Sequence, residues 1–217
     1  NNFTEISMQK IFDELKHHSS FHVDFHCSKI YSVPFIYSDP LFQETKDIIL
    51  KIRKAISTFG FFQVIDNVGS FFTSHYNRTF TGSLIHQAGI PAFTVELGSK
   101  KVVDLKQVEN GVLGIKNLLS HLGMLDVQPV GLQTPLSYSP ESYQIHLHPE
   151  CPESGVVKFL VNPGDHVKKD QPVATITDIF GRKKGKGIIK TNKEGYVICQ
   201  FEGAMFYSGS PILKIAS

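Results

Sequence analysis

The pattern of apolar residues changes abruptly near residue 125. Before that point, several segments carry apolar side chains every three or four positions, as helices do, and short strand-like runs separate them. After residue 152 the segments are short, rich in valine and isoleucine, and punctuated by glycine, which is typical of an all-β unit. The stretch between is rich in proline. We therefore expect an α/β domain over residues 1–125, a linker or crossover over 126–152, and a separate β domain over 153–217.

Within the α/β domain, helical and strand-like segments alternate. Helices are expected over residues 7–16, 39–59, 82–88 and 105–122, and strands over 21–27, 61–65 and 92–98. Asp39 and Asp104 are the expected N-caps of the two longer helices. The last helix carries an apolar stripe: Leu105, Val108, Val112, Ile115, Leu119 and Leu122.

Composition excludes several classes of protein. With 41% hydrophobic and 19% charged residues, the chain can form a core and is not a disordered protein. The net charge is +2, and the densest basic run, 182–186, is short and broken by glycine, so we expect a solvated hairpin tip and no nucleic-acid partner. No stretch is long enough to span a membrane. The three cysteines, Cys27, Cys151 and Cys199, form no CxxC pair, which favours a reducing, cytoplasmic location.

The strand over residues 21–27 offers the first candidate site. Its side chains alternate strictly, so His22, Asp24 and His26 share one face. His26 lies at the carboxyl end, where sites form in open α/β sheets, and its imidazole suits zinc. Asp24 could orient such a ligand. A strand-end histidine that only hydrogen-bonds to a loop is the alternative, and His22 stays undecided.

Glu96 is the second candidate. It stands among apolar residues at the end of the strand over 92–98, so partial desolvation would raise its pKa toward the range of a general base. An exposed glutamate at a strand end is the alternative. Tyr76 and Arg78 lie in a polar loop and could hold a substrate carboxylate or an oxyanion, although ordinary surface loops have the same composition.

Three segments resemble the succinylglutamate desuccinylase/aspartoacylase family. Val23-Asp24-Phe25-His26 resembles the Asp-Leu-His segment that supplies that family's third zinc ligand, and residues 89–98 (GIPAFTVELG) are similar to its Gly-Ile-Pro-Ala-x-Thr-x-Glu-x-Gly stretch. Residues 117–125 resemble the helix that follows. The resemblance implies an α/β fold with part of a zinc-carboxypeptidase-like mixed sheet, His26 as a zinc ligand and Glu96 as catalytic base.

One part of the family pattern is missing. The first two zinc ligands of the family come from a His-x-x-Glu motif before the Asp-x-His strand, and no His-x-x-Glu occurs in this chain. The arginines that recognise the substrate carboxylate also usually precede this region. Because catalytic zinc needs about three protein ligands, the remaining ligands are expected outside this chain. We therefore expect a fragment that is inactive alone.

The C-terminal segments resemble a lipoyl/biotinyl-like domain. The resemblance lies in Gly155-Val156-Val157, Gly164-Asp165-His166-Val167 and the run 171–176, with a looser repeat over 195–213. The hairpin near 178–181, where true carriers place the modified lysine, has no lysine at its tip. We therefore expect no such modification, and expect the domain to cap the site or to make oligomer contacts.

The activity implied by the resemblance is zinc-dependent hydrolysis of the amide bond of an N-acyl amino acid. The partner is then a small N-acyl amino acid or a peptide-like substrate, with homo-oligomer formation left open. Two alternatives remain: a metallocarboxypeptidase that acts on a peptide C-terminus, and a non-catalytic binding module on a decayed hydrolase scaffold.

Overall fold

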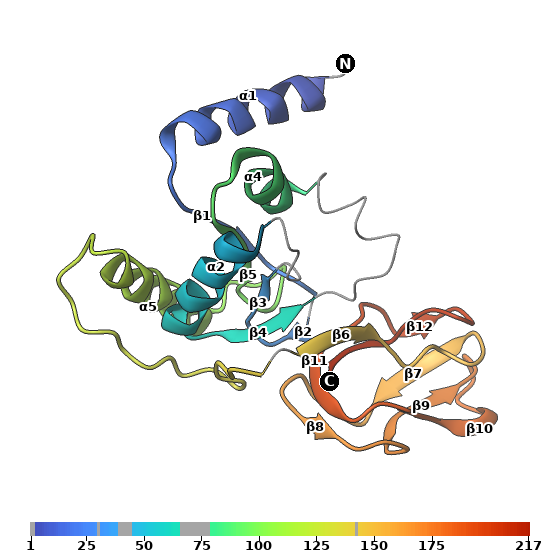
Figure 1. Cartoon of the computed structure of the whole chain (residues 1–217). Helices are drawn as coiled ribbons and strands as arrows, with labels where there is room; N and C mark the ends of the chain where they lie inside the picture. Colours follow the sequence, from blue (N-terminus) through green and yellow to red (C-terminus); the bar gives the residue numbers. More distant parts are fainter. Residues whose placement is uncertain (1–2, 30, 39–44, 66–78, 142) are drawn as a thin grey trace.

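The computed structural model describes residues 3–29, 31–38, 45–65, 79–141 and 143–217 (Figure 1). The expected helix start at Asp39 lies outside these residues, as do the candidate site residues Tyr76 and Arg78. No described helix is both long and apolar enough to cross a bilayer.

The described helices lie in the first part of the chain, close to their expected positions. They are α1 (Phe3–His18), α2 (Lys46–Phe59), α4 (Phe80–Ala88) and α5 (Leu105–His121). Asp104 caps α5 as expected, because its side chain accepts hydrogen bonds from the backbone N–H groups of Lys106 and Gln107. Gly89 ends α4 with a left-handed backbone (φ 69°), which glycine adopts at little cost. Local capping thus sets the boundaries that were expected from the sequence.

Strands make up the rest of the regular structure. Those of the first part are β1 (His22–His26), β2 (Tyr31–Ser32), β3 (Phe35–Ser38), β4 (Phe62–Ile65) and β5 (Ala92–Glu96). Those of the second part are β6 (Tyr143–Leu147), β7 (Gly155–Phe159), β8 (His166–Val167), β9 (Pro172–Thr177), β10 (Lys183–Lys190), β11 (Gly195–Gln200), β12 (Met205–Phe206) and β13 (Leu213–Ala216).

These strands form one large mixed sheet and one small antiparallel sheet. The large sheet has the order β1-β5-β3-β4-β6-β13-β11-β2, with β8 also on β11, and the small one has the order β10-β9-β7-β12. β1 runs parallel to β5, β3 runs antiparallel to β5, and β4 runs parallel to both β3 and β6. The described fold is therefore mixed α/β, with an all-β C-terminal part, as expected.

The expected β domain over residues 153–217 shares strands with the main sheet, and the stretch expected as a linker or crossover, residues 126–152, contains a strand. β6 falls inside the expected linker, and it pairs with β4 on one side and with β13 on the other. β2, from the first part, pairs with β11. The physical reason is that a strand edge leaves backbone N–H and C=O groups unpaired, and joining the two parts through β6 satisfies both edges.

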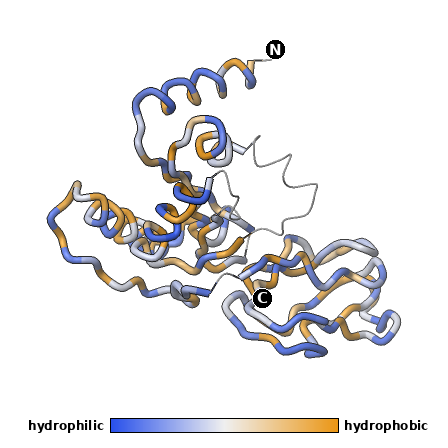
Figure 2. Tube along the Cα trace, viewed as in Figure 1, coloured by the Kyte–Doolittle hydropathy of each residue, from blue (hydrophilic) through white to orange (hydrophobic). Residues whose placement is uncertain are grey.

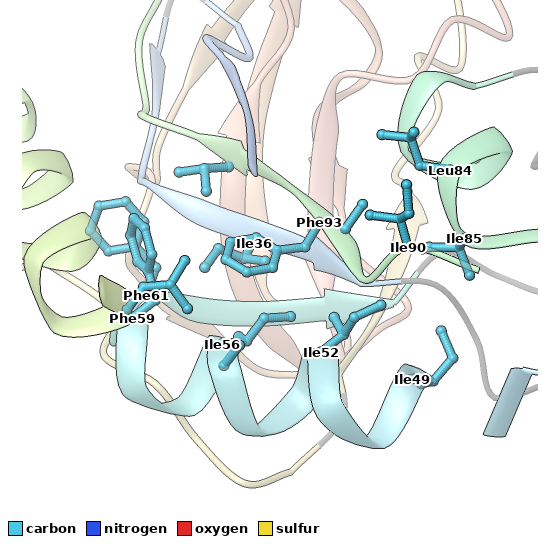
Figure 3. Close-up of a cluster of buried hydrophobic side chains, with 14 residues drawn as sticks. Ile36, Ile49, Ile52, Ile56, Phe59, Phe61, Leu84, Ile85, Ile90 and Phe93 are labelled. Atoms are coloured by element: carbon cyan, nitrogen blue, oxygen red, sulfur yellow. The ribbon is translucent and has the colours of Figure 1, made fainter. Parts of the chain in front are cut away.

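Three buried clusters hold the molecule together. The first lies between α2, α4 and the sheet, where Ile49, Ile52 and Ile56 of α2 point toward Ile36 and Phe93 of the strands (Figure 3). The second fills the C-terminal part. The third joins the two parts and contains Val33, Phe35, Phe62, Val64, Leu136, Ile145, Ile198 and Ala216. The C-terminal strands are thus fixed to the main sheet by packing as well as by pairing.

Two helices bury their apolar residues poorly. α1 mixes polar and apolar residues along its length (Figure 2) and has no buried residue. In α5 much of the apolar stripe is turned outward, with Leu105 71% and Val112 51% exposed, whereas Ile115 is half-buried against the first cluster. The buried face of this helix instead carries Asn110, Gly111, Gly114, Asn117 and Leu118.

The buried face of α5 packs closely against α2 and holds the segment that follows α5. A Cβ at Gly114 would overlap the ring of Phe59 at the end of α2, so the two helices can approach only because glycine stands there. The amide of Asn117 exchanges two hydrogen bonds with the backbone of Val130, at 2.8 and 2.9 Å. Asn110 binds the backbone of Gln133 in the same way, which ties the chain after α5 onto the helix.

Candidate active site

Two candidate residues meet at the carboxyl ends of β1 and β5. The strands are parallel neighbours, and their register places His26 directly opposite Glu96. The backbone N–H of Leu97 donates to the carbonyl of His26 at 2.9 Å, which continues the pairing beyond the strand end. The carboxyl ends of parallel strands are where open α/β sheets form their sites.

His26 is held by Asp24 from its own strand. Two residues apart on one strand, the side chains share a face, and the imidazole Nε2 lies 2.9 Å from the carboxylate Oδ2. Both side chains remain accessible, at 51% and 29% of their surface. A carboxylate in this position fixes the orientation of an imidazole ring, as partners of metal-binding histidines commonly do.

His22 occupies the same face of β1 but lies deeper. Its ring packs edge-on against Phe80 of α4, with 5.5 Å between the centroids. Burial lowers the pKa of this histidine, although the charge of Asp24 acts in the opposite direction. Its Nε2 is buried without a hydrogen-bond partner among the described residues. Burial thus favours the neutral form of His22, which lies at the start of β1, opposite Ala92.

Glu96 is partly desolvated. Burial raises the pKa of its carboxyl group, while the charges of Lys214, His26 and Lys29 act to lower it. Its Oε2 is buried and has no hydrogen-bond partner among the described residues. The direction of the shift is the one expected from the apolar neighbours of Glu96. A carboxylate with an unpaired oxygen in such surroundings is suited to accept a proton.

Lys214 also belongs to this region, and sequence reasoning missed it. It lies on β13, at the far end of the chain, and its Nζ donates a hydrogen bond to the phenol oxygen of Tyr37 on β3 at 2.8 Å. The same Nζ stands 5.4 Å from the centroid of the Tyr37 ring. No local motif marks this lysine, because only the pairing of the C-terminal strands with the main sheet brings it here.

The loops around the site are joined to the C-terminal part by charged groups. Lys29 lies over the ring of Phe201, 5.1 Å from its centroid. Glu202 forms ion pairs with Lys100 and Lys101 from the loop after β5, the latter at 3.2 Å. The segment after β11 is thereby anchored to the loops that follow β1 and β5.

The described residues do not complete a metal site. Among them, no group of three histidine, cysteine, aspartate or glutamate side chains is arranged so that it could hold a metal ion. Of the expected site residues, the structure brings together His26, Asp24 and Glu96. Tyr76 and Arg78 lie outside the described residues.

The fold resembles several solved proteins. No protein-family model matches the chain, and no curated protein matches its sequence. A succinylglutamate desuccinylase/aspartoacylase from Rhodobacter sphaeroides is matched with a TM-score of 0.78 and 17% identity, over 100% of this chain and 64% of that protein. The product-bound ectoine utilization protein EutE from Ruegeria pomeroyi is matched with a TM-score of 0.75 and 17% identity, over 100% of this chain and 63% of that protein. An aspartoacylase family protein from Mesorhizobium loti is matched with a TM-score of 0.72 and 15% identity, over 100% of this chain and 62% of that protein.

These matches extend over the whole of this chain, including its C-terminal strands, and over less than two thirds of each solved protein. At such low identity the likeness concerns the fold. The chain therefore has the mixed α/β fold found in solved proteins of the succinylglutamate desuccinylase/aspartoacylase family.

Proposed function

We propose that this chain belongs to the succinylglutamate desuccinylase/aspartoacylase family and forms part of a zinc-dependent hydrolase that cleaves the amide bond of an N-acyl amino acid. The observation that carries the proposal is the register of β1 and β5, which sets an imidazole held by a carboxylate opposite a partly buried carboxylate. This pair lies in a fold whose solved representatives include proteins described as desuccinylases and aspartoacylases.

The residues of this chain fit only part of a zinc site. His26 would be one ligand and Asp24 would orient it, but a catalytic site needs about three protein ligands and the described residues offer no such group. The remaining ligands would come from outside this chain. When bound, zinc would polarise a water molecule and the scissile carbonyl.

Glu96 would act as the general base. Its partly desolvated carboxylate takes a proton from the attacking water and then passes it to the leaving amine. The unpaired Oε2 leaves room for this exchange, because no described side chain already donates to it.

The proposal is tested by zinc content and hydrolysis in the longer protein, meaning this chain together with the part that would supply the remaining zinc ligands. N-acyl amino acids should be hydrolysed, and peptides should not lose their C-terminal residues. Cleavage of peptides without hydrolysis of N-acyl amino acids would indicate a carboxypeptidase. Absence of both activities would indicate a binding module. His26→Ala should lower zinc content and activity together. The matched control is His18→Ala, at the exposed end of α1, which should change neither.

The present chain alone provides the complementary test. With one ligand of the set, it should retain clearly less than one zinc per chain after dialysis and should not hydrolyse substrate. Stoichiometric, tightly bound zinc held by His26 and other residues of this chain would contradict the ligand assignment.

A further inference from the structure

Lys214 carries a charge that the proposed reaction does not yet use. It projects from β13 to Tyr37 of β3, although β4 and β6 stand between these strands in the sheet. The contact therefore runs across the sheet and does not arise from neighbouring strands. A long side chain held in this way has lost rotamer freedom, and its position needs a compensating interaction.

Lys214 forms no ion pair among the described residues, and the carboxylate that acts on it electrostatically is that of Glu96. The ammonium is partly buried, and among the described residues no carboxylate lies within ion-pair distance of it. Its hydrogen-bond acceptor is a neutral phenol. A partly buried ammonium group with no directly paired carboxylate is costly, and an anion bound to it would reduce that cost.

This charge stands close to the candidate base. Tyr37 is paired with Thr94, and Phe35 with Glu96, so Tyr37 lies diagonally across from Glu96 on adjoining strands. Among the neighbouring charges, that of Lys214 lowers the pKa of Glu96 most, ahead of those of His26 and Lys29. An anion held by Lys214 would thus lie beside the groups proposed to react.

We propose that Lys214 and the phenol of Tyr37 bind a carboxylate group of the substrate, so that the C-terminal strands supply a specificity-determining residue of the site. This inference rests on the proposed function. The lysine supplies the positive charge. When a carboxylate oxygen replaces the phenol oxygen as the acceptor of the lysine, the phenol O–H can donate a second hydrogen bond to the carboxylate. The carboxylate belongs either to the amino acid or to the end of a dicarboxylic acyl group.

Kinetics of the longer protein test this assignment. Lys214→Met keeps much of the aliphatic chain and removes the charge, so KM for an N-acyl amino acid should rise at least about tenfold, as expected for loss of a hydrogen bond to a charged group. The value of kcat should change less. Tyr37→Phe should raise KM by a smaller factor, and Lys214→Arg should restore part of the affinity. Lys158→Met, at an exposed residue of β7, is the matched control and should behave as wild type.

Paired substrates identify the carboxylate. If it is that of the amino acid, Lys214→Met should impair hydrolysis of N-acetylalanine and leave that of N-acetylalaninamide unchanged. If it belongs to the acyl group, the variant should instead discriminate N-succinylalaninamide from N-butyrylalaninamide. A KM within about twofold of wild type for every carboxylate-bearing substrate would overturn the inference and leave the proposed function standing.

A readout without turnover separates the two proposals. In the longer protein, acylation of lysines by acetic anhydride, followed by mass spectrometry, should show Lys214 protected several-fold by N-acetylalanine or N-succinylalaninamide and not by N-acetylalaninamide. Protection without hydrolysis would refute the proposed function and support the anion site. Hydrolysis with Lys214 equally labelled in all three mixtures would refute the anion site and support the proposed function.

Discussion

His26 and Glu96 end two parallel neighbouring strands and face each other in register. Their separation is therefore set by backbone pairing, which continues through the 2.9 Å hydrogen bond from Leu97 to His26. Residues on paired strands are held more precisely than residues on loops. Lys214, near the end of the chain, also reaches this region through its hydrogen bond to Tyr37, which is paired with Thr94 of β5.

Joining of the two parts through β6 has a consequence for stability. In the whole chain, Ile145→Ala should lower the free energy of unfolding by about 2–5 kcal/mol, because it removes a buried side chain from the cluster that joins the two parts. Leu147→Ala, at a 53% exposed residue of the same strand, is the matched control and should be nearly neutral. Urea unfolding of the two variants measures the difference. Equal stability of the two variants would show that packing of β6 does not join the two parts.

Most local structure was predictable because local signals determine it. The alternation in β1, the cap at Asp104 and the glycine stop at Gly89 act within a few residues, and each element lies close to its expected place. The sequence pattern placed His26 and Glu96 at the ends of two strands, but it did not indicate that these strands are parallel neighbours.

What the sequence did not reveal depends on contacts between distant segments. α5 shows this for packing, because its apolar stripe suggested one buried face whereas close approach at Gly114 and the bonds of Asn117 select another. Lys214 shows it for the site, because its position depends on the pairing of β13 with β6 and of β6 with β4. No periodicity within one segment encodes such a pairing.

Gly114 provides a test of the contact between α5 and α2. Gly114→Ala should destabilise the protein by about 1–3 kcal/mol, although alanine favours helices, because the new methyl group overlaps the ring of Phe59. Phe59 is fully buried beside Phe61 and Phe93 and has little room to move. Gly131→Ala is the matched control, since its added Cβ would meet nothing within 4 Å. Thermal unfolding of both variants decides, and equal melting temperatures would refute the close contact.

The cysteines should differ sharply in reactivity. Cys27 is exposed, whereas Cys151 and Cys199 are buried. Burial raises the pKa of Cys199 to about 11, so at pH 8 only a small fraction of this thiol is the reactive thiolate. Iodoacetamide at pH 8 should therefore modify the native protein at Cys27 alone, and all three cysteines after denaturation. Peptide mass spectrometry assigns the sites, and rapid native labelling of Cys199 would show that the contact between β11 and β13 opens easily.

Glu96 is the proposed base of a zinc hydrolase. Glu96→Gln preserves the size of the side chain and removes the proton acceptor, so zinc should stay bound while hydrolysis falls by about 10²–10⁴-fold, the usual contribution of general-base catalysis. The decisive measurement is zinc stoichiometry beside the hydrolysis rate of an N-acyl amino acid, for the longer protein and this variant. Full zinc with a collapsed rate is the result that a catalytic base requires. Full zinc with most of the activity retained would show that Glu96 is a structural residue.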